Sequence, residues 1–457
     1  LACCKVNLYP VMNFWKRYKE IYITILRLGL PILVGQIGMI VVGFADNIMV
    51  GRYSTEALAS ASFVNNLFNT AVFACIGFTY GLTPLVGALF TQGRSETIGR
   101  LLRSGILLNV LFALCVTAIM WVVYLHVDRL GQPQELMPLI KPYYRLYLSG
   151  VLAISLFNVF AQWAYGINRT AMPMWIILIA NVVNIIGNYA LIYGHWGMPE
   201  MGLNGAGLST LVARWLCPLI ILGVFLLKRD YRSYRDGFLD NWKVSGKHLN
   251  QVNRTSWPVA MQLAFESGSF TFAAIVAGWL GALSLAAFQV IVITGTLGFC
   301  IYYSVGSAVS VRVANAAGVA DRRAMRCVGF AGYHIILAIA TISSLIFMLG
   351  GRYIIPMFTD DPAVIALAMT LIGPLVLYQY ADATQITFAN ALRGTSNVLP
   401  MLWIAFVSYI IIGVPATYVI AIPCGMGTYG VILSFSVSLI VAAALFLLFF
   451  LKSTRKA

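Results

Sequence analysis

Three carboxylic acids lie inside long apolar stretches of the sequence. Asp46 stands in GFADNIMVGR with apolar residues on both sides, and Glu266 and Asp382 occupy comparable places further along the chain. A carboxylate in hydrocarbon is costly because the medium does not solvate its charge, so such a residue is a functional candidate by default. Burial favours the protonated form, which can release its proton when a cation arrives or water enters. The three acids therefore predict ion coupling inside a membrane.

A structural role is the alternative interpretation of these acids. Arg214 is the only basic residue deep in an apolar stretch, and it could pair with one acid. An acid could also cap a kinked helix. Because these roles account for at most one acid, we favour a function for the group.

Polar neighbours share helix faces with the two later acids. Gln262 lies four positions before Glu266. Tyr378 lies four positions before Asp382, and Gln385 lies three positions after it. These spacings place each set on one face of a helix. Carboxylate, phenol and amide oxygens suit a hard cation, so Glu266, Asp382 and Tyr378 predict a Na⁺ site.

Asparagines form similar stripes in the first half of the chain. Their spacing of three or four residues places them on shared helix faces. Such amides could line a cavity, or they could make hydrogen bonds between helices, and the sequence leaves both interpretations open. The residues that we predict for a substrate cavity are Asp46, Asn65, Asn69, Asn181, Asn184, Asn188, Gln262 and Gln385.

The elements that carry these residues are twelve apolar stretches. The chain has 457 residues, of which 60% are hydrophobic and only 10% are charged. A membrane-spanning helix needs about 20 mostly apolar residues. We therefore predict an all-α integral membrane protein. Its twelve transmembrane helices are expected at 21–50, 57–90, 104–126, 138–165, 171–194, 204–227, 255–280, 283–312, 327–349, 362–390, 398–421 and 427–451.

The net charge of +15 is a topology signal. With a cytoplasmic N-terminus, 24 of the 30 Lys and Arg residues fall in inner segments and five fall in outer segments. This bias predicts that both termini are cytoplasmic. The sequence has no basic groove with interleaved aromatic residues, so nucleic acid is not an expected partner.

The chain also contains an internal repeat. Pro31 matches Pro258 and Gly51 matches Gly278 at a constant offset of 227 residues. Six stretches on each side of a central loop indicate parallel repeats, which are typical of secondary transporters. No phosphate-binding GxxxxGK[ST] motif occurs, and the eight cysteines are scattered, so we expect neither an enzyme nor a resident cofactor. The predicted parts are an N-terminal cytoplasmic segment (1–20), two pseudo-symmetric six-helix bundles (21–227 and 255–451), a cytoplasmic linker (228–254) and a cytoplasmic tail (452–457).

Four motifs resemble the multidrug and toxic compound extrusion (MATE) family, in particular its NorM-type branch. They are FADNIMVG around Asp46, YGHWGMPEMGLNGAGLSTLVARW, LAFESGSFTF around Glu266 and DATQITFANALRG from Asp382. The resemblance implies a V-shaped pair of bundles that exports cationic and amphipathic drugs, driven by entry of Na⁺ or H⁺. It also implies a cation site at Glu266 and Asp382 and a proton- or cation-responsive acid at Asp46.

The predicted function is thus a cation-coupled multidrug efflux antiporter in the bacterial inner membrane. Its expected partners are drug-like organic cations and membrane lipid, with no obligate protein partner. The sequence leaves the coupling ion, Na⁺ or H⁺, open. A flippase for lipid-linked saccharides is the alternative, but such a protein needs a large cationic cavity for pyrophosphate, and Arg214 alone is a poor basis for one.

Overall fold

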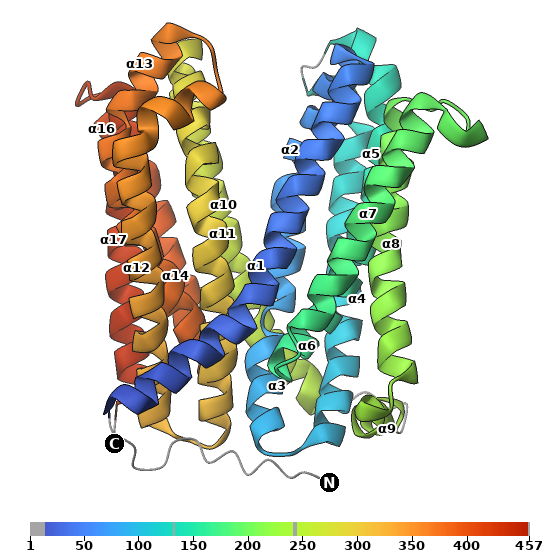
Figure 1. Ribbon diagram of the computed structural model, residues 1–457, viewed down its shortest axis with the longest axis vertical. Coiled ribbons are helices and arrows are strands. Elements are labelled where there is room, and N and C mark those ends of the chain that lie inside the picture. Colours follow the sequence, from blue (N-terminus) through green and yellow to red (C-terminus); the bar gives the residue numbers. More distant parts are fainter. Residues whose placement is uncertain (1–13, 131–132, 241–244, 456–457) are drawn as a thin grey trace. The chain divides into compact units, whose positions relative to one another are not determined.

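The computed structural model describes residues 14–130, 133–240 and 245–455. The predicted N-terminal segment (1–20), linker (228–254) and tail (452–457) therefore lie partly outside the described residues. The described chain is almost entirely helical and contains no strand (Figure 1). Backbone groups cannot find water in a bilayer, and a helix satisfies them within the segment.

The long apolar helices agree with the predicted spans. Eleven helical segments among the described residues are long and apolar enough to cross a membrane, and a pair bent by 50° completes twelve if it is one span. This confirms an all-α membrane protein. In chain order the main helices are α1 (Phe14–Tyr53), α2 (Thr55–Thr79), α3 (Leu82–Thr91), α4 (Ser95–Leu125), α5 (Met137–Ser149), α6 (Val151–Gly166), α7 (Ala171–Tyr193), α8 (Leu203–Leu227), α9 (Arg232–Leu239), α10 (Gly246–Trp279), α11 (Ala282–Gly318), α12 (Arg322–Ile354), α13 (Pro362–Thr370), α14 (Ile372–Gly394), α15 (Leu399–Ala405), α16 (Val414–Ala421) and α17 (Gly427–Ser453).

Several predicted spans are broken helices. The stretch 57–90 divides into α2 and α3 near Gly81, where the backbone of Ser256 packs closely. The stretch 138–165 divides into α5 and α6 at Gly150, against which the side chain of Arg214 packs. The stretch 398–421 contains a π-helix, η6 (Phe406–Gly413), between α15 and α16. Hydropathy does not reveal these breaks because the residues on both sides are equally apolar.

The chain forms two compact units. The N-terminal unit is Val34–Ala260, and the C-terminal unit contains Met261 onward together with the described residues up to Leu33. The chain therefore passes from one unit to the other inside α1, two residues after Pro31, and again inside α10, two residues after Pro258. A proline inside a helix removes one backbone hydrogen bond, so a helix can change its packing partners there. The two division points are 227 residues apart, which is the offset of the repeat. The predicted boundaries of the two bundles (21–227 and 255–451) stay predictions from the sequence.

The first part of α1 packs within the C-terminal unit. The hydroxyl of Tyr22 lies 2.9 Å from Nδ1 of His334 on α12. Gly29 faces the backbone of Ser304 and Val305 on α11. These contacts explain why the residues before Val34 group with the second half of the chain.

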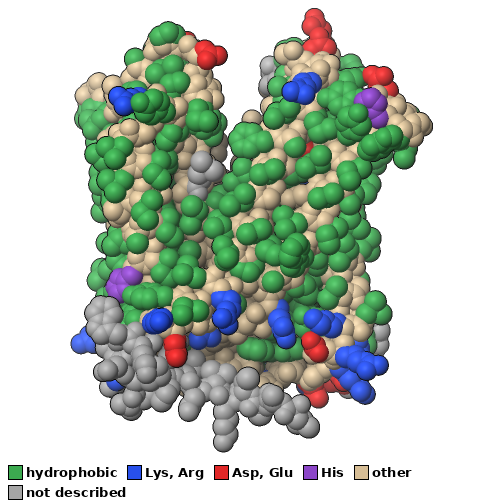
Figure 2. Space-filling view, viewed as in Figure 1, with side chains coloured by type: hydrophobic (Ala, Val, Ile, Leu, Met, Phe, Trp, Pro, Cys, Tyr) green, Lys and Arg blue, Asp and Glu red, His purple; other side chains and the backbone are tan. Residues whose placement is uncertain are grey.

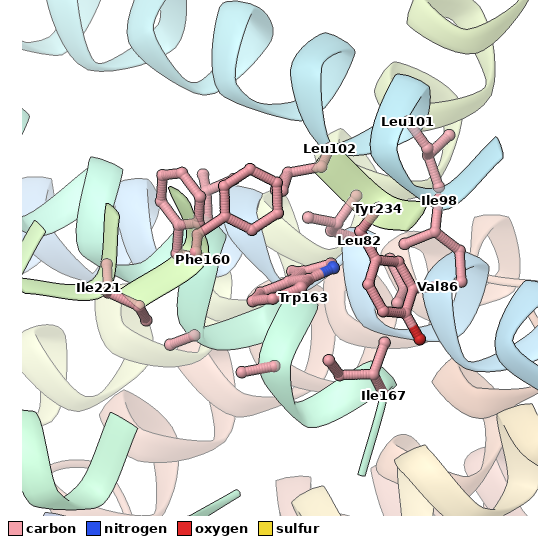
Figure 3. Close-up of a cluster of buried hydrophobic side chains, with 14 of the residues drawn as sticks. Leu82, Val86, Ile98, Leu101, Leu102, Phe160, Trp163, Ile167, Ile221 and Tyr234 are labelled. Carbon is pink, nitrogen blue, oxygen red and sulfur yellow. The ribbon is translucent and has the colours of Figure 1, made fainter. Parts of the chain in front are cut away.

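The N-terminal unit has an aromatic core near α9 (Figure 3). Trp163 on α6 is fully buried, and its ring meets those of Phe225, Tyr231 and Tyr234 edge to face, with ring centroids 5.1, 5.1 and 5.8 Å away. Edge-to-face pairs stabilise a core beyond the area that they bury. Through Tyr231 and Tyr234, this cluster packs the segment that follows α8 against the ends of α6 and α8.

Most basic side chains of the N-terminal unit lie at the same end. On the face seen in Figure 2, most of the Lys and Arg side chains of this unit are spread along the end that holds α9, fewer charged side chains lie at the opposite end, and hydrophobic side chains cover most of the height between. An apolar band bounded by basic residues is typical of a lipid-facing surface.

Two glycines bring α9 onto α4 backbone to backbone. A side chain on Gly99 of α4 would collide with the backbone of α9, and one on Gly237 of α9 would collide with the backbone of α4. Arg103 of α4 also donates hydrogen bonds to the backbone oxygens of Phe238 (3.1 Å) and Asp240 (2.7 Å). The α9 part of the linker is therefore docked on this unit.

The docking predicts a stability effect. Gly99→Val should destabilise the purified protein by about 1–3 kcal/mol, because overpacking forces α9 off α4. Gly223→Val is the matched control, since nothing lies within 4 Å of a side chain built at Gly223. Thermal unfolding in detergent and protease cleavage of the linker would report the effect. Equal stability of both variants would contradict the close packing.

Candidate functional site

Asp46 is the centre of a polar network in the N-terminal unit. It is half-buried on α1 and accepts a hydrogen bond from Nδ2 of Asn188 on α7. Asn184 lies one turn earlier on α7, and one orientation of its amide gives hydrogen bonds to both Asp46 and Thr210. In this orientation its Nδ2 donates to Oδ1 of Asp46 (2.8 Å), and its Oδ1 accepts from Oγ1 of Thr210 (3.1 Å). Amide orientation is assigned from such networks. The acid thus connects α1, α7 and α8.

A phenol and a guanidinium extend this network. Tyr143 on α5 is buried, interacts with the side chain of Asn65 on α2, and lies within electrostatic range of both Asp46 and Arg214. The guanidinium carbon of Arg214 lies 3.9 Å from the centre of the Tyr147 ring. Five helices therefore contribute polar groups to one region of this unit.

The structure separates the predicted asparagines into two groups. Asn65, Asn184 and Asn188 belong to the network around Asp46. Asn69 is exposed on α2. Asn181 lines an apolar groove of about 390 Å³ between α1 and α7, and its Nδ2 has no partner among the described residues.

Glu266 and Asp382 lie together in the C-terminal unit. Asp382 on α14 is 2% exposed, and Glu266 on α10 is half-buried and forms a hydrogen bond with Gln262. The two carboxylates interact with one another, and Glu266 also interacts with Arg393. Two negative charges in one buried place repel, and a proton or a bound cation relieves that repulsion.

Several oxygens near these acids lack partners. Oδ2 of Asp382, Oε1 of Gln262 and Oε1 of Gln385 are buried and accept no hydrogen bond from the described part of the chain. Tyr378 lies one turn before Asp382 and interacts with both acids. Buried acceptors without donors are costly, and carboxylate, amide and phenol oxygens match the ligands of a hard cation. This set of oxygen ligands therefore fits a small cation.

Tyr409 is a site residue that sequence reasoning missed. It lies in the π-helix η6, is 2% exposed, and interacts with Glu266, Asp382 and Tyr378. Its hydroxyl has no partner within the described ranges. A single tyrosine in FVSYIIIG looks like a packing residue, and the local change of helix type that presents it has no clear sequence signal. Such π-helical turns occur often at functional sites.

Two basic residues accompany the acids, whereas the sequence analysis found only Arg214 within a span. Arg393 is 4% exposed near the end of α14, although it follows the predicted span 362–390 and was counted among the basic residues of the inner segments. Among the described residues, no group of three or more His, Cys, Asp or Glu side chains could hold a metal ion. Any cation at Glu266 and Asp382 would therefore also use neutral oxygens.

Comparison with known proteins identifies the family. The sequence profile of the MatE family matches residues 31–190 and 258–419, and the two matches begin 227 residues apart. The chain belongs to the MatE family. This MATE protein is 28% identical over 397 residues, or 87% of each chain, to "Multidrug resistance protein NorM" of Photobacterium profundum. The resemblance to the MATE family and its NorM-type branch is thus confirmed.

Solved structures show the same fold. A transporter of the MOP superfamily from Pyrococcus furiosus has a TM-score of 0.85 at 18% identity, covering 96% of this chain and 97% of its own. An outward-facing multidrug resistance MATE family transporter has a TM-score of 0.86 at 18% identity, with 95% and 96% coverage. At 18% sequence identity, both similarities are similarities of fold alone.

The unpartnered hydroxyl of Tyr409 predicts a contrast in stability. Tyr409→Phe should change the free energy of unfolding by less than about 0.5 kcal/mol, because it removes a group with no hydrogen bond to lose. Tyr144→Phe is the matched variant: it loses a buried 2.7 Å hydrogen bond to the Met120 oxygen and should cost about 1 kcal/mol or more. Thermal unfolding of both proteins tests this. A larger loss for Tyr409→Phe would show that its hydroxyl is bonded.

Proposed function

We propose that this MATE-family protein is a multidrug efflux antiporter that exchanges cationic or amphipathic organic compounds for Na⁺ or H⁺. The observation that carries the proposal is the placement of its acids. Asp46, Glu266 and Asp382 lie within membrane-spanning helices, and each has polar groups from other helices around it. The kinship to NorM, a protein named for multidrug resistance, supports efflux as the direction.

The N-terminal unit is suited to exchange of a proton for an organic cation. The amides of Asn184 and Asn188 donate to the carboxylate of Asp46 and so stabilise its charged form. Burial opposes that charge. Because the two effects oppose one another, a proton and a cationic substrate can compete for the same carboxylate. Substrate affinity is then expected to fall as the pH falls.

The C-terminal unit is suited to a small inorganic cation. Glu266, Asp382 and Tyr378 bring together two acidic groups and a phenol, and the nearby amide oxygens of Gln262 and Gln385 accept no hydrogen bond from the residues that the structure describes. Na⁺ prefers such hard oxygen ligands. We assign Na⁺ coupling to this group and the response to protons and substrate to Asp46.

Coupling follows if the two transport states bind these ligands with different affinity. A ligand shifts a conformational equilibrium only by its differential affinity for the two states. Loading or protonating the acids supplies that difference, so no resident cofactor and no obligate protein partner is needed. We also propose a bacterial inner-membrane location with both termini cytoplasmic, as the distribution of basic residues indicates. The flippase alternative is weaker, because Arg214 lies within electrostatic range of Asp46, which offsets its charge.

The division of labour gives one experiment with three variants. Wild-type protein, Glu266→Gln, Asp382→Asn and Asp46→Asn are purified, and binding of a fluorescent organic cation is measured over a pH series with and without Na⁺. Glu266→Gln and Asp382→Asn should abolish the Na⁺ effect, because neutral amides keep the size but remove the charge. Asp46→Asn should remove the pH dependence and leave Na⁺ binding measurable.

Glu56→Gln provides the control, since this acid is exposed in the first turn of α2. It should behave as wild type in the same assay. If Asp46→Asn removes the Na⁺ effect while Glu266→Gln retains it, the assignment of ions to the two units is wrong. Dye efflux driven by imposed Na⁺ or H⁺ gradients in vesicles then tests transport itself.

A further inference from the structure

Arg214 has an unusual position for a charged residue. It lies in the middle of α8, eleven residues from Leu203 and thirteen from Leu227. At 1.5 Å per residue it is roughly 16–20 Å from either end of the helix. A cation at such a depth is costly unless it has a function. The side chain is half-buried in the polar region of the N-terminal unit.

The protein fixes this guanidinium without using its donors. The Tyr147 ring lies 3.9 Å below it, and Gly150 leaves the space that its Cδ and one terminal nitrogen occupy. Within the described ranges, however, Arg214 makes neither a hydrogen bond nor an ion pair. Cation–π contact orients a guanidinium but leaves its N–H groups free. The N–H groups of Arg214 are therefore available to a ligand.

Arg214 and Asp46 form two separate poles of one region. They interact electrostatically, and Tyr143 interacts with both. No ion pair joins the two among the residues that the structure describes. Their charges are close enough to act on one molecule and are not consumed by direct contact.

We propose that Arg214 binds the carboxylate of zwitterionic amphipathic substrates whose cationic group lies at Asp46. A guanidinium recognises a carboxylate through two parallel hydrogen bonds. A ligand that carries both charges satisfies both poles, whereas a simple cation is repelled by Arg214. Arg214 thus selects between substrates by attraction of one class and repulsion of the other. The inference rests on the proposed role of Asp46 in substrate binding.

A matched pair of dyes tests this selection. Rhodamine 110 carries a delocalised cation and a free carboxylate, and rhodamine 123 is its methyl ester, which carries the cation alone. Fluorescence anisotropy with the purified full-length protein gives the affinity for each. Arg214→Gln should weaken rhodamine 110 binding by roughly tenfold to a hundredfold. It should leave rhodamine 123 unchanged or bound more tightly, because a repulsive charge is gone.

Two further variants sharpen the result. Arg145→Gln removes an exposed positive charge from α5 and should change neither dye. Arg214→Lys keeps the charge but loses the planar fork, so rhodamine 110 should weaken by a smaller factor. If Arg214→Gln does not fold, Arg214→Lys replaces it in the test, and its loss of affinity should again be confined to rhodamine 110.

The outcomes separate this inference from the proposed function. Equal weakening of both dyes by Arg214→Gln, or no weakening of rhodamine 110, overturns the role of Arg214. If Asp46→Asn leaves rhodamine 123 binding unchanged, the proposed role of Asp46 fails as well. If Asp46→Asn abolishes rhodamine 123 binding but the dyes respond alike to Arg214→Gln, only the inference about Arg214 fails.

Discussion

The cost of an unsolvated charge in hydrocarbon is the constraint on which this protein depends. It requires every backbone polar group to be satisfied within a helix, and it explains why the described chain is nearly all helix. It also requires each intramembrane acid to have compensating groups from neighbouring helices. Asp46 meets that requirement through Asn184 and Asn188, and Glu266 meets it through Arg393, whereas Oδ2 of Asp382 has no such partner among the described residues. An acid held in such a place responds strongly to a proton or a cation, because the surrounding medium does not solvate its charge.

The two units meet this constraint in opposite ways. Around Asp46 the neighbours are donors, the amides of Asn184 and Asn188, with an arginine further away. Around Glu266 and Asp382 there is a surplus of acceptors, several of them buried without a partner in the described chain. A site rich in donors holds an anionic side chain ready for an incoming cationic group. A site rich in acceptors is incomplete without a small cation. This difference is the physical basis for assigning distinct ligands to the repeats.

The sequence predicts the spans and the three acids because both follow from the incompatibility of charge with lipid. The repeat is equally visible, since the offset that relates Pro31 to Pro258 also separates the points where the units divide. The partners of the acids are harder to foresee, because they depend on packing between distant helices. Thr210 and Tyr409 look like ordinary span residues until α8 and η6 are placed beside the acids. Helix breaks such as the one at Gly150 depend on a neighbouring side chain and have no counterpart in hydropathy.

Proton release on substrate binding tests the central claim most directly. Purified protein in weakly buffered solution is mixed with a permanently charged cation such as tetraphenylphosphonium, over a pH series, and the protons released per bound ligand are counted. The account predicts that wild-type protein releases protons at acidic pH, that the yield falls as the pH rises and Asp46 is already ionised, and that Asp46→Asn releases none. Wild-type binding without proton release at any pH, or undiminished release from Asp46→Asn, would contradict exchange at this carboxylate.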